Sequence, residues 1–410
     1  MPATRDTMSE QQLLDRMQLV AESFRPAAPI DRRSLFSGRA DQISEIFSAV
    51  AQPGQHAVIY GERGVGKTSL AAVSAELLEA ANVLTARATC DVSDDFSSVW
   101  RKALGEVGFR KRRQAVGFAD AHAETHETAA AALGSGTVTP DAVRSVLQRM
   151  GEKRPLAIFL DEFDRLRDPD AGVLFADTIK AMSDRVVPAT LFLIGVADSV
   201  AGLIKEHRSI ERALVQIHMP RMSRAELAEI ASNGLAAARM TIAQTALKKV
   251  TAVSQGLPHY TQLLTQLAAR SALAEHRAGV GARDVDAAVE RAVERAQGSV
   301  VEAYRQATAA KGGAIYPEVL LACALVEEDE FGFFRAAEVT EPLSKILGRP
   351  CPPLTFARHL DRMSASARGG VLEKHGGAGA RRYRFENPLL QPYVLMRGLA
   401  EGTVGFKDLP

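Results

Sequence analysis

The chain has 410 residues, which is enough for two or three domains of about 150 residues each. Hydrophobic residues make up 46% and charged residues 24%, which excludes a mostly disordered chain, a collagen-like fibre and a disulfide-stapled miniprotein. The 50 Lys and Arg residues nearly balance the 49 Asp and Glu residues, for a net charge of +1. Whole-chain charge therefore points to no class of partner, and only local clusters can.

The cysteines and the lengths of the apolar runs indicate which cellular compartment to expect. Cys90, Cys323 and Cys351 are far apart, with no CxxC pair and no neighbouring histidine group, so neither a zinc site nor a disulfide framework is expected. The N-terminal segment is polar and lacks the apolar run of a signal peptide. No window approaches 18 consecutive apolar residues. We therefore expect a cytoplasmic protein in a reducing compartment, without a membrane partner.

Residues 1–34 are polar and proline-containing, and they predict a short helix followed by an extended arm. Between residues 35 and 220, short apolar runs alternate with helical patterns, as in βαβ units. The runs are rich in Val, Ile, Leu and Phe without polar alternation, which is typical of strands buried on both faces. They lie at 56–60, 82–89, 155–160, 189–195 and 213–219. This pattern predicts an α/β domain with a doubly wound, parallel, five-stranded sheet.

The pattern changes twice after residue 220. Four amphipathic helices are expected in a helical domain at 221–297, and they span 223–238, 242–254, 258–275 and 282–297. Residues 298–410, where Gly/Pro breaks separate helices, are expected to form a third domain. The polar segment 110–139 is expected to be either a helix or a mobile insertion. Its basic run at 110–113 favours a solvated loop over a nucleic-acid contact.

A glycine-rich stretch at 61–68, GERGVGKT, matches G-x-x-x-x-G-K-[ST] between a predicted strand and a predicted helix. Its glycines let successive backbone N–H groups point at phosphates, and the helix N-terminus adds its dipole. Lys67 supplies a positive charge to the β- and γ-phosphates, and the Thr68 hydroxyl can ligate Mg²⁺. The whole loop is expected to hold ATP and Mg²⁺: Gly61, Glu62, Arg63, Gly64, Val65, Gly66, Lys67, Thr68 and Ser69. An ordinary Gly-rich turn is the alternative.

An acidic pair follows the predicted strand at 155–160, in the stretch LAIFLDEFD. Asp161 at the strand end can hold Mg²⁺, and Glu162 can orient or polarise the attacking water in hydrolysis. Carboxylates also cap helices, which is the alternative for this pair. Because the pair follows the phosphate-binding loop by about 95 residues, catalysis is the favoured interpretation.

The order of these motifs resembles that of an AAA+ ATPase. FSGR (36–39), the phosphate-binding loop, LDE, GVADS (195–199) and GLPHY (256–260) occur in the order of the branch containing origin-recognition proteins and STAND signalling ATPases. The resemblance covers about residues 35–300, and a winged-helix ending would extend it to about 395. It implies a parallel P-loop sheet, an α-helical lid, a winged-helix domain and slow, Mg²⁺-dependent ATP hydrolysis.

The resemblance also implies roles for residues outside the two main motifs. Phe36, Gly38 and Arg39 match the box that lines the adenine pocket, although they could form only a turn. Pro258 and His259 match the lid box near the γ-phosphate. Many relatives have an arginine at the position of His259. The histidine therefore makes a weaker or pH-sensitive phosphate contact, or it only packs.

Three further residues are placed by the resemblance. Asp198 occupies a sensor position that is commonly Asn, and because two anions repel, it is expected to hold the water or an arginine instead of the γ-phosphate. Arg212, and after it Arg208, is expected to be an arginine finger acting on a neighbouring subunit, which implies a homo-oligomer. A surface arginine is the alternative for both.

Residues 316–397 predict three helices followed by a strand, a glycine loop and a second strand, the outline of a winged helix. Over 349–397, nine basic residues face three acidic ones. Arg358 and Arg362 are four residues apart and share a face of the third helix, while Arg381 and Arg382 adjoin the wing glycines. We expect contacts with duplex DNA here, although winged helices also serve as protein-docking or autoinhibitory modules.

The favoured hypothesis is an ATP-binding and hydrolysing AAA+ switch that cycles between ATP and ADP and engages duplex DNA through the winged helix. The alternative is a STAND-type regulator, in which the winged helix holds the protein closed until a protein ligand arrives, and any downstream effector is a separate protein. A third hypothesis, suggested by Asp198 and His259, is a nucleotide-dependent scaffold with negligible turnover.

Overall fold

The computed structural model describes residues 9–26, 28, 36–112, 124–196, 208–309, 314–377 and 380–410. Its centre is a five-stranded parallel sheet with the strand order β2-β5-β6-β1-β7. The strands are β1 (His56–Gly61), β2 (Leu84–Thr89), β5 (Leu156–Asp161), β6 (Ala189–Val196) and β7 (Leu214–His218). All five strands lie at the predicted apolar runs, which confirms the expected doubly wound α/β fold.

The central strands β1, β5 and β6 are almost entirely buried because each face of the sheet supports its own core, whereas the edge strands β2 and β7 carry polar residues such as Arg87 and Gln216. Ile59 of β1 belongs to one core and Val58 to the other, and β5 and β6 alternate in the same way. Phe159 and Phe192 stack across neighbouring strands with ring centroids 4.6 Å apart. The first core is covered by α2 (Ala40–Ala51) and α3 (Lys67–Ala80), and the second by α4 (Phe96–Gly105), α5 (Pro140–Gly151) and α6 (Ala171–Asp184).

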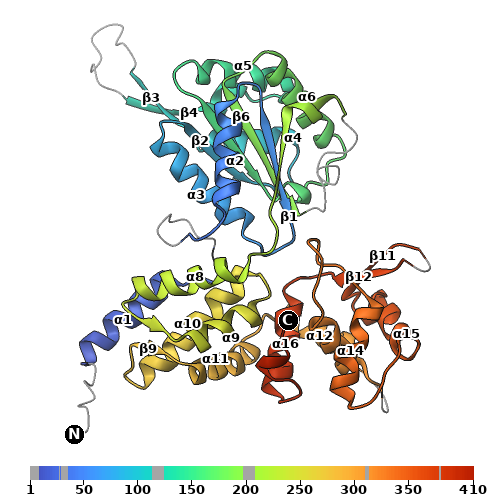
Figure 1. Cartoon of the computed structure of the whole chain (residues 1–410). Helices are drawn as coiled ribbons and strands as arrows, with labels where there is room; N and C mark the ends of the chain where they lie inside the picture. The colour runs from blue at the N-terminus through green and yellow to red at the C-terminus, as the bar shows by residue number, and fades with distance from the viewer. Residues whose placement is uncertain are drawn as a thin grey trace.

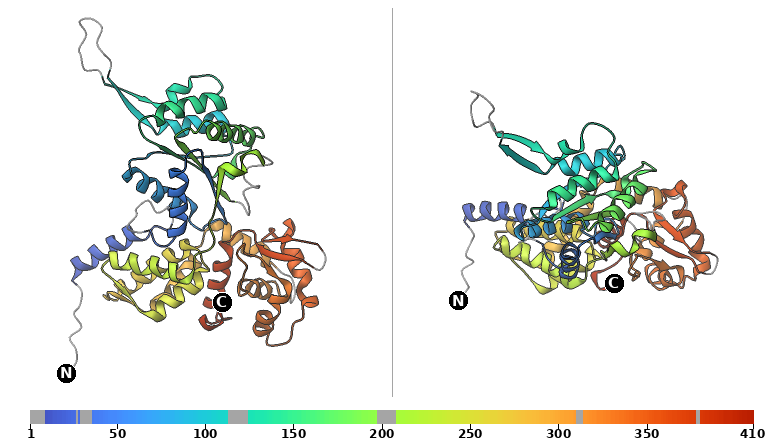
Figure 2. Two further views of the ribbon diagram at one scale, coloured as in Figure 1. Left: turned by 45° about the horizontal axis from the view of Figure 1, so that its top comes forward. Right: turned by 90° about the horizontal axis from the view of Figure 1, so that it is seen from above.

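A β-hairpin projects from the α/β domain (Figures 1 and 2). β3 (Gly108–Arg112) pairs antiparallel with β4 (Glu124–Thr128), with Arg110 opposite His126, and the turn η2 (Ala129–Leu133) follows. The helix that was one of the two alternatives for residues 110–139 was therefore wrong where residues 110–112 pair with residues 124–126. Within the described residues, these two strands form a sheet of their own, separate from the five-stranded sheet. The basic run begins inside β3, and residues 113–123 lie outside the described part of the chain.

The four helices expected in the helical domain at 221–297, called the lid below, are present as α8 (Arg224–Ala237), α9 (Gln244–Ser254), α10 (Pro258–Ala274) and α11 (Ala282–Glu294). A two-residue parallel pair, β8 (Thr241–Ile242) with β9 (Gly279–Val280), joins them and was not predicted. The N-terminal helix α1 (Glu10–Ser23) packs on α8 and α10, and Figure 1 shows it along the outer side of the lid. The contact is close, since a Cβ on Gly234 would lie 2.4 Å from the Phe24 ring. The N-terminal segment is thereby fixed against the lid.

The part of the chain at 298–410, called the C-terminal segment below, contains the three predicted helices and the predicted hairpin. Three further elements, α12, β10 and α16, were not individually predicted, and β10 completes a three-stranded antiparallel sheet with the order β10-β12-β11. Figure 1 shows α16 between the lid and the remaining C-terminal helices. The elements are α12 (Gly298–Thr308), α13 (Tyr316–Ala324), β10 (Phe334–Arg335), α14 (Ala336–Leu347), α15 (Pro353–Met363), β11 (Leu372–His375), β12 (Arg382–Phe385) and α16 (Leu390–Ala400).

Short helical turns complete the described chain: η3 (Phe163–Arg165), η4 (Arg208–Ala213), η5 (Ser366–Arg368) and η6 (Phe406–Asp408). Among the helices that the structure describes, none combines the length and apolar character needed to cross a membrane. Cys90, Cys323 and Cys351 are buried and free.

Candidate functional site

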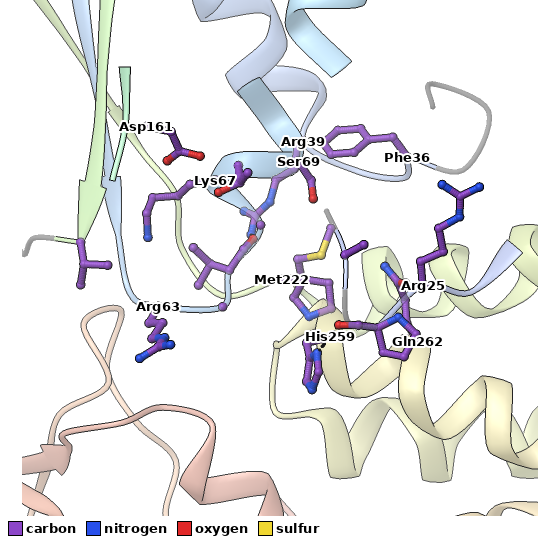
Figure 3. A pocket seen from close by; sticks show the side chains of 18 of the residues that line it. Arg25, Phe36, Arg39, Arg63, Lys67, Ser69, Asp161, Met222, His259 and Gln262 are labelled. Atoms are coloured by element: carbon purple, nitrogen blue, oxygen red, sulfur yellow. Dashed lines mark hydrogen bonds between the residues drawn. The ribbon is translucent and has the colours of Figure 1, made fainter. Parts of the chain in front are cut away.

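A cavity of about 650 Å³ lies between the carboxyl edge of the sheet and the lid. Its size falls within the usual range for small-molecule sites. In parallel sheets the carboxyl ends of the strands meet at one edge, and the loops there form binding sites. Figure 3 shows Lys67 and Asp161 at one end of the cavity and Arg25, His259 and Gln262 at the other.

The glycine-rich loop adopts a conformation that requires glycine at its two ends. Gly61 has a φ of 150°, and a Cβ there would lie 2.4 Å from the carbonyl oxygen of Met219. Gly66 has a φ of 98° and occupies the N-cap of α3. The first backbone N–H groups of α3 have no partner within the helix, and residues 63–69 line the cavity. The loop and helix end therefore form an anion-binding site.

Lys67 is buried in this loop. Its Nζ donates hydrogen bonds to the carbonyl oxygens of Gly61 at 2.8 Å and Glu62 at 2.7 Å. Burial lowers the pKa of Lys67 to about 8, although Asp164, Asp161 and Glu62 act in the opposite direction. Burial disfavours the charged form of Lys67, and the negative charge of a bound phosphate would stabilise that form.

The lowered pKa of Lys67 predicts a pH dependence of phosphate binding. Bound phosphate favours charged Lys67, so binding takes up a proton wherever the free site is deprotonated, that is above about pH 8. We expect the Kd of a fluorescent ATP analogue to be constant up to about pH 8. Above that it should rise, approaching tenfold per pH unit. Lys67→Arg, which stays charged, should bind more weakly but without this rise. A wild-type Kd that is flat from pH 7 to 9.5 would contradict the assignment.

The acidic pair lies directly after β5. The backbone N–H of Glu162 donates to Asp161 Oδ1 at 2.8 Å, and Glu162 itself is left-handed, with a φ of 53°. The Glu162 carboxylate pairs with Arg165 at 2.6 Å, and both side chains are about half exposed. Asp164 accepts a hydrogen bond from the Val196 backbone at 2.9 Å, which ties the acidic loop to the end of β6. Asp164 and Arg165 also line the cavity and were not predicted.

Arg39 lines the cavity, but its guanidinium group donates hydrogen bonds to the protein backbone. Its Nη2 donates to the carbonyl oxygens of Val65, at 3.3 Å, and Pro220, and its backbone N–H donates to Glu226. Burial lowers the pKa of Arg39. Arg39 thus joins the phosphate-binding loop to the segment that leads into the lid.

His259 lies at the start of α10, beside Pro258, and both line the cavity. Its Nδ1 is 2.7 Å from the carbonyl oxygen of Pro26, its ring packs edge-on against Tyr260, and burial lowers its pKa. In this structure His259 therefore anchors the N-terminal segment to the lid. This is the packing alternative among the expectations for this histidine.

The N-terminal segment contributes lining residues that sequence reasoning missed. The Arg25 backbone donates to Gln262 at 3.0 Å, and Gln266 donates to the Phe24 carbonyl at 2.7 Å. Arg25, Pro26 and Gln262 consequently face the cavity. No local motif marks them, because these partners are more than 230 residues apart.

The structure gathers most of the predicted site residues around the cavity. The lining includes Phe36, Arg39, Arg63, Gly64, Val65, Gly66, Lys67, Thr68, Ser69, Asp161, Glu162, Pro258 and His259. Gly38, Gly61, Glu62 and Arg212 are outside the lining. Asp198 lies outside the described residues, and so does the side chain of Arg208.

Comparisons with known proteins agree with this geometry. Residues 35–193 match the sequence profile of the AAA ATPase domain. No curated protein sequence matches the chain. Among solved structures, the chain is similar to a Walker-type ATPase of Pyrococcus abyssi, with a TM-score of 0.52 and 14% identity, over 90% of this chain and 98% of that one.

Two proteins of Aeropyrum pernix also align with the chain. The ORC2 protein, in ADPNP and ADP complexes, has a TM-score of 0.48 and 13% identity over 91% of this chain and 96% of its own. The ORC1 protein in complex with DNA has a TM-score of 0.45 and 15% identity over 88% and 92%. At these identities the likeness concerns the fold alone. The segment at residues 35–193 is therefore, by its sequence profile, an AAA ATPase domain.

Proposed function

We propose that the chain binds ATP·Mg²⁺ in this cavity, hydrolyses it, and engages duplex DNA through its C-terminal segment. The observation that carries the proposal is that Lys67, Thr68, Asp161 and Glu162 line one cavity at the carboxyl edge of the sheet. These side chains come from two loops about 95 residues apart, and the fold brings them together.

Each of these residues has a distinct role in the proposed reaction. Lys67 and the N-terminus of α3 bind the phosphates. The Thr68 hydroxyl and the Asp161 carboxylate fit Mg²⁺, which usually takes one or two protein oxygens together with substrate phosphates and water. The metal would neutralise charge on the phosphates. Glu162 orients the attacking water, for which its carboxylate must leave Arg165.

Arg212 suits the proposed role of a finger that acts on a neighbouring subunit. It lies in η4, is exposed, and stays outside the lining of its own cavity. A finger of this kind requires a homo-oligomer. We retain the expectation of a cytoplasmic protein, which the free cysteines support.

We propose further that the elements from α13 to β12 form a winged-helix module, with α15 as the recognition helix. The N-terminal half of α15 presents an exposed surface of Leu354, Thr355 and Arg358, and Leu354 is 92% exposed. Within the described residues, Arg358 has no carboxylate partner. An unpaired arginine beside an apolar group suits contacts with phosphates and base edges.

The other predicted DNA contacts are partly engaged within the protein. Arg381 pairs with Asp361 at 3.4 Å, and Arg382 pairs with Asp329 at 3.1 Å, although both arginines remain exposed. Arg362 donates to the Tyr316 hydroxyl at 3.1 Å. The available positive charge is therefore smaller than the composition suggests, and Arg358 is the foremost candidate.

Arg358→Ala should weaken duplex binding about three- to tenfold and reduce the salt dependence by about one released counterion. The control is Arg305→Ala on α12, which removes the same charge from an exposed arginine outside the proposed module. Fluorescence anisotropy with a labelled duplex at two salt concentrations measures both effects. Equal affinities of Arg358→Ala and wild type would contradict this assignment.

A second candidate function is a STAND-type regulator whose C-terminal segment holds the protein closed. It is supported by the packing of the C-terminal segment on the phosphate-binding loop, where Leu389 lies 3.2 Å from the position of a Cβ on Gly64. This candidate predicts tightly retained ADP and no DNA affinity above background. The same anisotropy experiment separates the two functions.

A further inference from the structure

A buried charged cluster connects the phosphate-binding loop with the C-terminal segment. Arg221, between β7 and α8, donates from Nε to Glu62 at 2.8 Å and from Nη1 to Glu328 at 2.7 Å. The three side chains are only 20%, 13% and 6% exposed, in that order. Gln391 of α16 also accepts a hydrogen bond from Arg221. One arginine thus links the nucleotide loop, the start of the lid and two parts of the C-terminal segment.

Apolar and backbone contacts surround this cluster. A Cβ on Gly332 would lie 2.2 Å from Glu62 Oε1, so the backbone of the C-terminal segment lies directly against the Glu62 carboxylate. His218 packs between Tyr60 and Phe331, with ring centroids 5.2 and 5.5 Å away. The Tyr260 hydroxyl donates to the Leu389 carbonyl at 2.6 Å. These contacts fix the C-terminal segment against the outer side of the loop.

The C-terminal segment contacts the loop without obstructing the cavity. Within the described residues, the cavity lining extends no further along the chain than Gln262. In Figure 3, Arg63 lies on the side of the loop that faces the C-terminal segment, whereas Lys67 and Asp161 lie together on the other side. The docked segment therefore packs on the side of the loop opposite Lys67 and Asp161.

Glu62 contacts both the phosphate-binding lysine and the arginine that binds the C-terminal segment. Its carbonyl oxygen accepts a hydrogen bond from Lys67, and its carboxylate pairs with Arg221. Without Arg221, a buried and uncompensated carboxylate would remain in the loop that receives a polyanion. A charge left unpaired at such a depth is strongly unfavourable, and it would also repel the phosphates.

We infer that Arg221 is a positioning residue that couples ATP binding to docking of the C-terminal segment. Docking stabilises the phosphate-binding conformation of the loop, and by thermodynamic reciprocity bound ATP strengthens docking. The inference rests on the proposed binding of ATP in this cavity and adds its regulation.

The first test measures the Kd of a fluorescent ATP analogue. Arg221→Gln should bind about 5- to 50-fold more weakly than wild type, within the usual range of coupling between sites. Glu62→Gln combined with Arg221→Gln should recover part of this loss, because the phosphate-binding loop then carries no unpaired carboxylate, and the recovery stays partial because Glu328 still lacks its partner. The control is Arg277→Gln, which breaks the ion pair between Arg277 and the buried Asp284 within the lid and should keep wild-type affinity. Partial recovery in the double variant distinguishes positioning from a general loss of stability.

Leu389→Ala provides a second variant that leaves the charges intact. It removes the apolar contact with Gly64 and should weaken binding about threefold, which decides the question if Arg221→Gln does not fold. Spin labels on Gln52→Cys and Arg349→Cys, both exposed sites, measure docking directly. ATP should narrow their distance distribution in the wild type and leave it broad in Arg221→Gln.

Three outcomes would overturn the coupling: wild-type affinity in Arg221→Gln and Leu389→Ala, an equal loss in Arg277→Gln, or a distance distribution that ATP does not change. A wild-type protein that binds no ATP analogue would instead refute the proposed function. The two failures are therefore distinguishable.

Discussion

Lys67→Ala is expected to raise the Kd for ATP about 100-fold or more. Lys67 is the buried cation of the phosphate-binding loop, and hydrogen bonds between charged groups are among the strongest in proteins. In this structure its Nζ also donates hydrogen bonds to the carbonyl oxygens of Gly61 and Glu62. Lys67→Ala therefore removes these two hydrogen bonds of the loop as well as the charge that binds the phosphates. Titration calorimetry or a fluorescent analogue measures the effect.

Two controls separate the loss of charge from a loss of structure. Lys180→Ala removes an exposed lysine from α6, on the other face of the sheet, and should leave the Kd unchanged. Thermal unfolding of Lys67→Ala shows whether the loop still folds. If a folded Lys67→Ala protein bound ATP within about threefold of wild type, the assignment of the cavity would be wrong.

Glu162→Gln should lower ATP turnover by about 10²- to 10³-fold and leave ATP binding nearly intact. The amide keeps the shape of the side chain but removes the charge that polarises the attacking water, and removal of one electrostatic contribution typically costs this much. Glu162 lies in the cavity directly after Asp161, and the amide oxygen of the variant would still accept a hydrogen bond from Arg165. Phosphate release under saturating ATP measures the effect.

Glu152→Gln is the matched control, because Glu152 is an exposed glutamate at the end of α5. Equal turnover in wild type and Glu162→Gln would remove Glu162 from the mechanism. Multiple turnovers by wild type that Glu162→Gln abolishes would exclude the third hypothesis, a scaffold with negligible turnover.

The sequence predicted the sheet and the nucleotide loop because both depend on local pattern. Val58 and Ile59 face opposite cores, so the central strands β1, β5 and β6 appear in the sequence as nearly unbroken apolar runs. The glycines at 61 and 66 are required by backbone conformation, which a motif records directly. Asp161 is the last residue of β5, and its distance from the loop along the sequence is bridged by parallel topology.

The remaining features depend on contacts that no local pattern encodes. Pro26 reaches the cavity because its carbonyl oxygen is bound by His259, which is 233 positions away in the sequence. Glu62 was expected only as part of the nucleotide-binding loop, and no local pattern shows that its carboxylate pairs with Arg221, whose other partner, Glu328, follows α13. The β3–β4 hairpin was missed because its sequence is polar and lacks the apolar run by which the strands of the central sheet were predicted. Charge counting cannot show that Asp361 accepts from both Lys374 and Arg381.

The measurement that tests the central claim most directly is duplex-DNA binding by Glu162→Gln. Anisotropy of a labelled duplex would be followed with ATP and with ADP, each at two salt concentrations. We predict binding that requires ATP and weakens as salt rises, because phosphate contacts release counterions. Flat anisotropy in every condition would contradict the DNA switch, and the search would turn to a protein ligand of a STAND-type regulator.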